Sequence, residues 1–388
     1  MRRLLILVSV VVFVDAMLFG ALAPLIPGYA DEFGLSKTGA GLLVGAFGAG
    51  ALLGGIPGGL AAMRWGPKVA VVAGLALLAA SSFAFAAADG PWALGLARFV
   101  QGASSTTTWA GAFAWLTVAT PRERRGELIG TAFAAAVFGA ILGPMFGAIA
   151  DAVSVRVAFS SVGAVAAALA AWAATRPQAA PEGQSAKSVR RALTDRSFLG
   201  GLWLNTLPAW LFGMLVVLVP LRLDDGGFAP FAIGAVFLAA GLIEVVVNPL
   251  LGRFSDRRGR LLPVRFALAA SIVIAIAFAV ARDPYPVAAL TILAAVSFGA
   301  FYTPGIALVS DRAEAVGMSQ AIGFGIMNTA WALGNMSGPS LAGVLAQAGG
   351  DALPYLLGAA LCLLTLLATG SARTPSARRV ARSDSSSR

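Results

Sequence analysis

The chain has 388 residues, of which 58% are hydrophobic and 12% are charged, and its formal net charge is +10. A soluble domain carries roughly 25% charged residues, so this composition excludes an ordinary soluble domain and indicates a polytopic membrane protein. The chain lacks histidine and has one cysteine, Cys362, which excludes an intrachain disulfide and histidine-based metal or proton-transfer chemistry.

Apolar runs of membrane-spanning length follow one another along the chain and predict an all-α membrane protein with twelve transmembrane helices. The predicted spans cover residues 4–30, 39–62, 67–88, 92–119, 127–150, 156–175, 198–221, 230–252, 262–281, 285–309, 318–346 and 352–370. The longest connection, 176–197, is rich in polar residues and predicts a cytoplasmic linker. We therefore expect an N-terminal six-helix bundle at 1–175, a C-terminal six-helix bundle at 198–370, and a disordered cytoplasmic tail at 371–388.

The first span begins like a signal peptide, because an apolar stretch follows Arg2 and Arg3. However, Asp15 interrupts that stretch, Pro24 follows the cleavage-like residues, and apolar sequence continues to Pro27. These features favour a first helix that is retained.

Basic residues are distributed unevenly between alternate loops. The loops on the side of the N-terminus hold most of them, whereas the opposite loops hold only Lys37, Arg156, Arg222 and Arg282 among several acids. This positive-inside bias predicts a protein of the cell membrane with both termini in the cytoplasm. It also accounts for the net charge, so no nucleic-acid partner is expected.

Asp15 is unusual because it places a carboxylate inside a predicted membrane span. Counted from Leu4 at about 1.5 Å per residue, it lies roughly 16 Å deep, near the centre of a hydrocarbon core of about 30 Å. A charge there costs roughly 2.5–3.5 kcal/mol or more, so Asp15 is a functional-site hypothesis. The alternative is a shifted boundary that leaves Asp15 near the membrane surface.

Arg98 is a second charge within a predicted span, roughly 9–11 Å from the external face. It can snorkel outward, or it can face inward and pair with Asp15, which would lower the cost of both charges. Gln101 and Ser105 share the helical face of Arg98 and could continue a polar seam along it.

Glu244 is the second intramembrane acid, about fourteen residues into the predicted span 230–252. Asn248 shares its face one turn further on, and no basic residue is evident in the same span. This setting favours reversible protonation, which makes Glu244 the better candidate for a proton carrier and leaves Asp15 as the substrate or coupling acid. The alternative is a structural hydrogen bond from Glu244 to another helix.

Other polar and aromatic residues of the spans are candidates for lining a cavity, although packing is the commoner role for such residues. They are Trp109, Asn205, Tyr302, Asn328 and Trp331. Aromatic faces attract cations, so a cavity that combines them with Asp15 and Glu244 would suit lipophilic cations.

Two motifs recur six spans apart and indicate two structurally similar halves. GLAAMRWGPK at 59–68 follows the second span, and GRFSDRRGRL at 252–261 follows the eighth. GAILGPMFG at 139–147 lies in the fifth span, and GNMSGPSLAG at 334–343 lies in the eleventh. Glycines every four residues give a smooth face for close helix packing, and the proline permits a bend.

The loop motifs resemble the loop signature of the major facilitator superfamily. Its residues are Gly59, Arg64 and Gly66 in the first copy and Gly252, Asp256, Arg257, Gly259 and Arg260 in the second. The resemblance implies a cytoplasmic gate in which Asp256 pairs with arginines, and each exposed pair contributes only about 0–1 kcal/mol, so that the gate can reopen. The first copy departs from the family pattern at Met63 and Pro67, so either the second copy carries this role alone or the gating balance differs.

Two further motifs extend the resemblance. Arg98-x-x-Gln101-Gly102 is similar to the second motif of the superfamily, and the fifth-span motif is similar to that of its twelve-helix drug/proton antiporters. The fifth-span motif consists of Gly139, Gly143, Pro144 and Gly147. The resemblance implies that this face lies at the interface of the two halves, where it limits leakage; the alternative is plain close packing.

The first span also resembles that of the vesicular monoamine transporters, which are distant members of the superfamily. Those transporters carry acids in their seventh and tenth helices. Here the matching part of the seventh span, 214–220, is apolar, and the tenth span is uncharged within the membrane. A monoamine specificity is therefore not supported.

The resemblance covers essentially the whole chain and implies the major facilitator fold, two pseudo-symmetric six-helix bundles with a cavity that opens alternately to either side. We expect a proton-coupled exporter of small lipophilic or cationic molecules, in which Asp15 and Glu244 exchange protons against substrate and Arg98 tunes Asp15. The alternatives are a proton-coupled uptake symporter and a sugar or metabolite exporter of the same superfamily. A non-transporting membrane receptor fits the intramembrane charges poorly.

No enzyme is expected, because the sequence holds no histidine-based triad, no metal-ligand cluster and no phosphate-binding loop. An ion gradient must then supply the energy for transport. We expect no cofactor and no metal. The expected partners are a small-molecule substrate, protons and the lipid bilayer, with the chain acting as a monomer.

Overall fold

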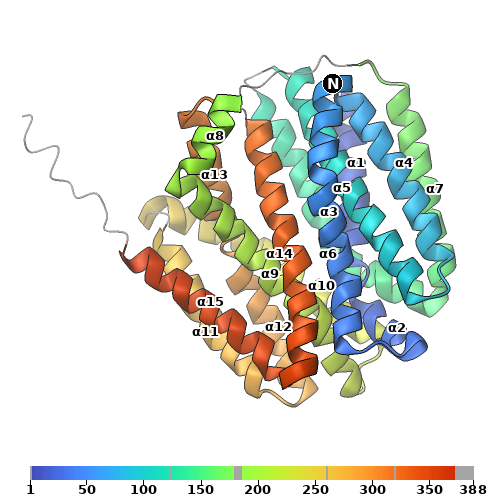
Figure 1. The fold of residues 1–388 in the computed structure, drawn as a ribbon, viewed down its shortest axis with the longest axis vertical. Coiled ribbons are helices and arrows are strands. Elements are labelled where there is room, and N and C mark those ends of the chain that lie inside the picture. Colours follow the sequence, from blue (N-terminus) through green and yellow to red (C-terminus); the bar gives the residue numbers. More distant parts are fainter. Residues whose placement is uncertain (1, 122–123, 179–185, 259–260, 319, 372–388) are drawn as a thin grey trace, which may run out of the picture.

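The computed structural model describes residues 2–121, 124–178, 186–258, 261–318 and 320–371, and this part of the chain is helical with no strand (Figure 1). Ten of its helical stretches are long and apolar enough to cross a membrane. Helices α5 (Pro91–Ala119) and α14 (Gln320–Gly349) are also long enough, with 29 and 30 residues, but they are not among those ten. Both carry many Gly, Ser, Thr and amide side chains, and both hold residues of the predicted site.

The first half of the chain forms one set of packed helices. They are α1 (Arg2–Gly20), the short 3-10 helix η1 (Ala23–Leu25), α2 (Ile26–Phe33), α3 (Lys37–Trp65), α4 (Pro67–Ala86), α5, α6 (Arg125–Val153) and α7 (Val155–Ala174). Helix α5 packs between α3 and α4, α4 packs on α7, and α1 packs on α6. A hydrogen bond from the amide of Gly39 to Ser36 Oγ (3.2 Å) caps the start of α3.

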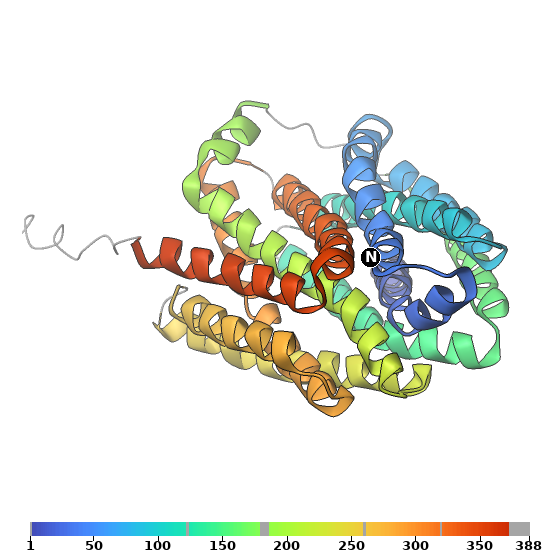
Figure 2. The ribbon, with the colours of Figure 1, turned by 60° about the horizontal axis from the view of Figure 1, so that its bottom comes forward.

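The second half forms a comparable set. Its helices are α8 (Ala186–Thr194), α9 (Arg196–Asp225), α10 (Pro230–Arg258), α11 (Leu261–Val280), α12 (Pro284–Gly299), α13 (Tyr302–Ala315), α14 and α15 (Ala352–Ser371). Helix α9 packs on α14 and α13, α10 packs on α12, and α11 packs on α15. Figure 2 shows the two sets side by side, the first in blue to green and the second in yellow-green to red.

Two predicted spans are interrupted in the structure. The first continues past α1 as η1 and α2, because Pro24 has no amide proton to donate and the chain tightens into a 3-10 turn there. The tenth is divided into α12 and α13 at Ala300 and Phe301. The chain also forms a helix within the predicted linker, α8, whose Ala192 is buried in the same apolar cluster as Phe198 of α9.

The glycine motifs of α6 and α14 make equivalent contacts in the two halves. Gly139, Gly143 and Gly147 lie against the backbone of α1 and the residues just after it, so closely that no side chain would fit. Gly334 and Gly338 lie against the backbone of α9 in the same way. The prediction that the α6 glycines face the other half is therefore wrong: their flat surface allows α1 of the same half to approach.

The prolines of the same two motifs make the contact between the halves. A Cβ added at Gly234 of α10 would lie 3.0 Å from the carbonyl oxygen of Pro144. A Cβ added at Gly41 of α3 would clash with the carbonyl oxygen of Pro339. Helices α1, α3 and α6 thus correspond to α9, α10 and α14, which is the pseudo-symmetry predicted for the fold.

The two halves touch at one end of the α3–α14 pair and separate toward the other. The glycines of one face of α3 are Gly41, Gly45, Gly48, Gly55 and Gly59. A Cβ at any of the first three would clash with α14, one at Gly55 would lie 3.5 Å from Thr329, and one at Gly59 would meet nothing of the described chain within 4 Å. We call the closed end the Lys37 end, and the opposite end, which holds the N-terminus and α8, the linker end (Figure 1).

Candidate functional site

Asp15 lies on α1 with its carboxylate turned toward α5. It is 3% exposed, and its Oδ2 accepts hydrogen bonds from Ser105 Oγ (2.6 Å) and Trp109 Nε1 (2.8 Å). The two donors stand one turn apart on α5, which places both in reach of a single oxygen. The ring of Trp109 lies 5.3 Å from that of Phe113, so an ionisable group meets aromatic surface here.

Arg98 lies on the same face of α5 and is 1% exposed. One of its terminal nitrogens donates to the carbonyl oxygen of Leu18 (3.3 Å) and to Gln101 Oε1 (3.1 Å). Its guanidinium carbon lies 4.8 Å from the centre of the Phe47 ring. The residue is therefore directed inward rather than snorkelling to the surface.

Arg98 and Asp15 do not form the direct ion pair that was considered from the sequence. None of the ion pairs found among the described residues joins them, although the two charges are close enough to interact electrostatically. Asp15 accepts instead from two residues of α5, and Arg98 donates to Leu18 of α1 and Gln101 of α5. Within the described chain, Arg98 Nε and Gln101 Nε2 are buried donors without a hydrogen-bond partner, and such donors are costly unless a ligand or water meets them.

Glu244 lies on α10 and is partly buried. Its carboxylate packs against Gly299 at the end of α12, where no Cβ would fit. It also interacts electrostatically with Tyr302, the first residue of α13, whose hydroxyl lies near the indole of Trp331 of α14. The break between α12 and α13 thus brings Glu244 and two predicted cavity residues together.

An aromatic cluster connects the surroundings of the two acids. Phe19 of α1 lies 5.1 Å from Phe47 of α3 and 5.2 Å from Trp331 of α14, measured between ring centroids. These three residues, which we call the aromatic layer, belong to a small apolar cluster that spans both halves. Phe47 adjoins Arg98 in the first half, and Trp331 adjoins Tyr302 in the second.

The three asparagines among the predicted site residues are placed differently. Asn205 of α9 is buried and donates to the carbonyl oxygen of Met327 (2.8 Å), so it joins α9 to α14 within one half. Asn328 is partly exposed on α14. For Asn248 the structure describes the backbone of α10, while its side chain lies outside the described part of the chain.

The first copy of the predicted gate lies at the linker end. Gly59 and Arg64 belong to α3 rather than to a loop, and the guanidinium of Arg64 lies 5.8 Å from the centre of the Trp65 ring. Gly66 makes the turn into α4 with φ of 92°, a conformation that favours glycine.

The second copy of the gate is less completely described. Gly252, Asp256 and Arg257 lie on the backbone of α10 with their side chains outside the described part of the chain, and Gly259 and Arg260 lie wholly outside the described residues. The gating role of this loop therefore stays a prediction.

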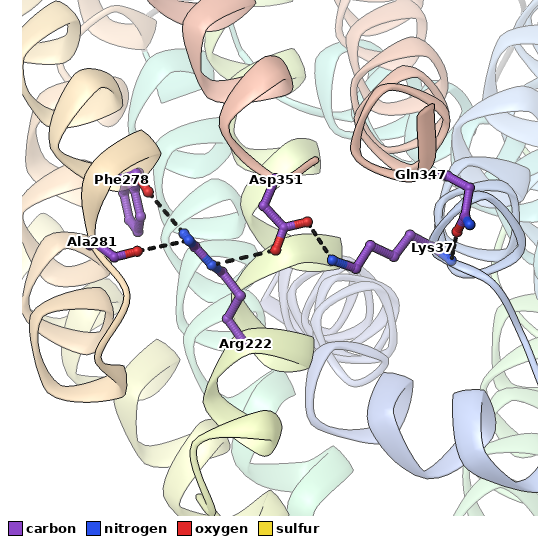
Figure 3. Close-up of polar contacts among 6 residues, drawn as sticks. All are labelled: Lys37, Arg222, Phe278, Ala281, Gln347 and Asp351. Atoms are coloured by element: carbon purple, nitrogen blue, oxygen red, sulfur yellow. Dashed lines mark hydrogen bonds and ion pairs between the residues drawn. The ribbon is translucent and has the colours of Figure 1, made fainter. Parts of the chain in front are cut away.

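A polar cluster at the Lys37 end joins the halves and was missed in the sequence. Asp351, between α14 and α15, is bonded to Lys37 Nζ of α3 and lies 3.6 Å from Arg222 Nε of α9 (Figure 3). Gln347 accepts from the amide of Lys37 (3.2 Å), and Arg222 donates to two carbonyl oxygens at the end of α11 (2.9 and 2.7 Å). The signal available in the sequence was the opposite charge of Lys37 and Asp351 in loops of the two halves. We call these four residues the Asp351 cluster.

Comparison with known protein families identifies the chain. The sequence model of the Major Facilitator Superfamily matches residues 8–324. The chain belongs to the Major Facilitator Superfamily. The predicted family and the predicted fold are both confirmed.

Curated relatives of this chain include vesicular acetylcholine transporters. The probable vesicular acetylcholine transporter-A of Danio rerio is 30% identical over 149 residues, 37% of this chain and 29% of that protein. The vesicular acetylcholine transporters of Rattus norvegicus and Homo sapiens are 29% identical over 150 residues, 38% of this chain and 28% of each relative. The chain therefore spans less than a third of the length of these relatives.

Solved structures share the fold over nearly the whole chain. A bacterial homolog of the human lysosomal transporter Spinster, in an inward-facing and unoccupied conformation, superposes with a TM-score of 0.79 at 15% identity and covers 97% of this chain and 99% of its own. The human organic anion transporter MFSD10 gives 0.70 at 18% identity over 95% and 99%. The nucleoside transporter NupG gives 0.72 at 16% identity over 95% and 98%.

Proposed function

We propose that this transporter exports small lipophilic cations in exchange for protons. The observation that carries the proposal is a pair of acids within the membrane spans, Asp15 in the first half and Glu244 in the second. Asp15 interacts electrostatically with Arg98, whose guanidinium lies over the Phe47 ring of the aromatic layer, and Glu244 interacts electrostatically with Tyr302. An acid within the membrane is retained at a cost of roughly 2.5–3.5 kcal/mol or more, which favours a functional role for both.

Asp15 is the acid that we assign to the substrate. Its carboxylate is held by Ser105 and Trp109, and charge-assisted hydrogen bonds of this kind fix the orientation of an ionised group. The faces of Trp109 and Phe113 offer the aromatic surface that attracts organic cations. The relatives named as acetylcholine transporters carry, by that name, a small organic cation, which supports the same substrate class.

Glu244 is the acid that we assign to the proton. A carboxylate beside a tyrosine hydroxyl has a neighbour that can donate to its ionised form and accept from its protonated form. The chain has no histidine, so a carboxylate is the natural carrier of a proton through the spans. In an exchange cycle, Glu244 would be protonated when the site faces outward and would release the proton when the site faces inward.

The orientation follows from the distribution of basic residues. We propose that the linker end faces the cytoplasm, with both termini there, and that the Lys37 end faces outward across the cell membrane. The structure would then represent the inward-facing state of a monomer made of two bundles, 1–175 and 198–370. The Spinster homolog that it resembles was solved in an inward-facing conformation.

The test is transport by purified protein in lipid vesicles across an imposed pH difference, with ethidium and acetylcholine as probes. The wild-type protein should move a probe against its gradient and protons the opposite way. Glu244→Gln should lose pH-driven accumulation but keep exchange of probe for probe. Asp15→Asn should bind the probe about 10- to 150-fold more weakly, because an interaction with a charged group contributes roughly 1.5–3 kcal/mol.

Matched controls are Asp89→Asn and Glu314→Gln, which make the same chemical changes at exposed positions and should leave transport unchanged. If Asp15→Asn and Glu244→Gln together retain pH-driven export, the proposed mechanism is wrong. Movement of probe and protons in the same direction would instead identify an uptake symporter. Movement of sugars rather than cations would identify a metabolite exporter.

A further inference from the structure

A small cavity lies in the first half at the Lys37 end, where α2 meets the junction of α6 and α7 (Figure 1). Its volume is about 110 Å³, several times the roughly 30 Å³ that one water molecule occupies in the liquid. The residues that line it all belong to the first half and are Leu25, Gly28, Tyr29, Glu32, Asp151 and Val155. Leu25 and Tyr29 are buried, whereas Gly28, Glu32 and Asp151 are exposed at the rim. The cavity is therefore built without Asp15 and Glu244.

The rim of this cavity carries two carboxylates that lack a counter-ion within the described chain. A Cβ added at Gly28 of α2 would lie 3.9 Å from Asp151 Oδ1, so the carboxylate of α6 lies beside the helix that carries Glu32. Among the ion pairs of the described residues, none includes either acid. Arg156, the basic residue nearest to Asp151 in the sequence, lies 3.9 Å from Asp89 instead.

Both carboxylates lie where the backbone already concentrates negative charge. Glu32 is in the last turn of α2 and Asp151 is in the last turn of α6, and neither turn holds a basic residue. The C-terminal end of a helix carries about half a negative charge, which disfavours an acid and favours a cation. The N-terminus of α7 opposes this field less, because Ser154 Oγ accepts from the amide of Val157 (3.3 Å). The electrostatics of the cavity therefore favour a cation.

A buried tyrosine in the cavity also lacks a partner. Tyr29 is 9% exposed and lines the cavity, yet its hydroxyl makes no hydrogen bond within the described chain. Its oxygen is not among the sealed polar atoms that lack a partner, so it is open to the cavity. The ring is held between Phe33 and Phe85, whose centroids lie 5.9 and 6.1 Å away. Buried hydroxyl groups are normally hydrogen-bonded, so a molecule in the cavity is needed to satisfy this one.

We propose that this cavity binds a primary alkylammonium ion. Such an ion has three N–H donors, as the lysine side chain has. The cavity presents three acceptors, which are the carboxylates of Glu32 and Asp151 and the hydroxyl oxygen of Tyr29. Leu25 and Val155 offer apolar surface to the alkyl group. A quaternary ammonium ion has no N–H to donate and leaves Tyr29 unsatisfied, so the cavity selects primary over quaternary ions.

A metal ion is the alternative ligand for these oxygen atoms. Ca²⁺ takes about six to eight oxygen ligands, whereas the described part of the chain holds no group of three or more acids or cysteines placed to bind a metal. Two carboxylates and one hydroxyl group match the three donors of an ammonium ion better. The inference does not depend on the roles proposed for Asp15 and Glu244, because neither residue lines the cavity.

The test observes Tyr29 directly, by fluorine nuclear magnetic resonance of the full chain labelled with 3-fluorotyrosine in detergent micelles. The chain has four tyrosines, and the signal that is absent from Tyr29→Phe identifies Tyr29. Ethylammonium chloride at neutral pH should shift this signal along a saturable curve. Tetramethylammonium chloride at the same concentrations should leave it in place. The signals of the other tyrosines report whether each variant is folded.

Two variants test the carboxylates. Glu32→Gln and Asp151→Asn should each weaken the binding of ethylammonium about fivefold, the effect of losing one partly exposed ion pair. The matched control is Asp31→Asn, because Asp31 is exposed on α2 directly before Glu32 but does not line the cavity. This control should change the affinity less than about twofold, as surface substitutions usually do.

A Tyr29 signal that does not move with ethylammonium overturns the inference. An effect of Asp31→Asn as large as that of Glu32→Gln also overturns it, because binding would then reflect general attraction to an acidic surface. A response to calcium chloride in place of ethylammonium would assign the cavity to a metal ion instead. Acetylcholine, a probe of the proposed export, has a quaternary nitrogen. Its transport can therefore fail while ethylammonium still binds at Tyr29, or the reverse, so the two proposals are tested separately.

Discussion

The Lys37 end and the linker end of the interface are built from the same two helices, yet only one of them is closed. At the Lys37 end, α3 presents glycines to Ser340 and Gly343 of α14, and backbone meets backbone. Toward the linker end, the glycine face of α3 continues to Gly59 but meets nothing of the described chain. Glycine alone therefore does not close an interface, because the facing helix must also approach.

The closed end combines a steric and an electrostatic contact. Small residues let α3 and α14 approach closely, which strengthens dispersion contacts in a membrane where the hydrophobic effect offers little. The Asp351 cluster adds one ion pair between the halves, Lys37–Asp351, and a second within the second half, Arg222–Asp351. The difference between the ends indicates that contacts at the Lys37 end stabilise the conformation seen in the structure. Substitutions at this end should therefore have the largest effect on the equilibrium between conformations that are open and closed there.

The largest effect is expected from Gly41→Ala. The new methyl group would clash with the carbonyl oxygen of Pro339 and lie 3.1 Å from the Cα of Gly343, and backbone atoms cannot move aside as a flexible side chain can. Overpacking of this kind costs about 1–3 kcal/mol, which corresponds to roughly a 5- to 150-fold rise in the open-to-closed ratio. This ratio compares molecules in which the halves are separated at the Lys37 end with molecules in which they touch there. It is measured from the distance between spin labels attached to cysteines introduced at positions 32 and 348.

Gly59→Ala is the matched control for that variant. It lies on the same face of the same helix with nothing of the described chain within 4 Å, and alanine favours a helix interior by roughly 0.5–1 kcal/mol over glycine. Its open-to-closed ratio should equal that of the wild-type protein. Equal shifts in both variants would show that helix propensity, rather than contact with α14, sets the ratio.

The sequence predicted the elements of this interface better than their meeting points. Apolar runs and the prolines of α6 and α14 predicted spans and two similar halves, since these depend on local pattern. The position of the α6 glycines could not be derived, because a flat face suits any close neighbour and the neighbour is α1 of the same half. Which helix approaches a given face depends on tilts that no single segment determines.

The candidate site shows the same limit. Asp15, Arg98, Trp109 and Glu244 were found because charge and polarity within a span are unusual. Their partners were harder to predict: Ser105 and Trp109 satisfy Asp15, and Arg98 contacts Leu18 and Phe47 instead of forming a direct pair. Trp331 was predicted as a cavity candidate, but Phe19 and Phe47 of the aromatic layer were missed, because their rings are ordinary membrane residues that gain significance only when the two halves bring them together.

An intermediate effect is expected from Asp351→Asn. The change removes the charge shared by Lys37 and Arg222, while Arg222 keeps its two carbonyl acceptors on α11. A partly exposed pair contributes up to about 1 kcal/mol, so the open-to-closed ratio should rise by up to about fivefold at low salt. The rise should shrink at high salt, where the pair already contributes less to the wild-type protein.

The control for the Asp351 cluster is Arg312→Gln, because Arg312 lies 3.8 Å from Asp195 within the second half. Removing this ion pair should leave the ratio unchanged at any salt concentration. An Asp351→Asn variant that matches the wild-type protein at low salt would show that steric contact alone closes the Lys37 end.

The smallest effect is expected from Gly234→Ala, at the pseudo-symmetric counterpart of the Gly41 contact. The new methyl group would lie 2.9 Å from the Cβ of Ala148, so something must shift, and 3.0 Å from the carbonyl oxygen of Pro144; both contacts are longer than the clash with Pro339 expected for Gly41→Ala. The open-to-closed ratio should therefore rise only about two- to threefold, below the roughly fivefold change that the lower limit for overpacking gives. Gly130→Ala on α6, which has nothing of the described chain within 4 Å, should give no change. If Gly234→Ala raised the open-to-closed ratio as much as Gly41→Ala, the contacts at Pro144 and Pro339 would contribute equally to closing this end. The α3–α14 contact would then not be the main one.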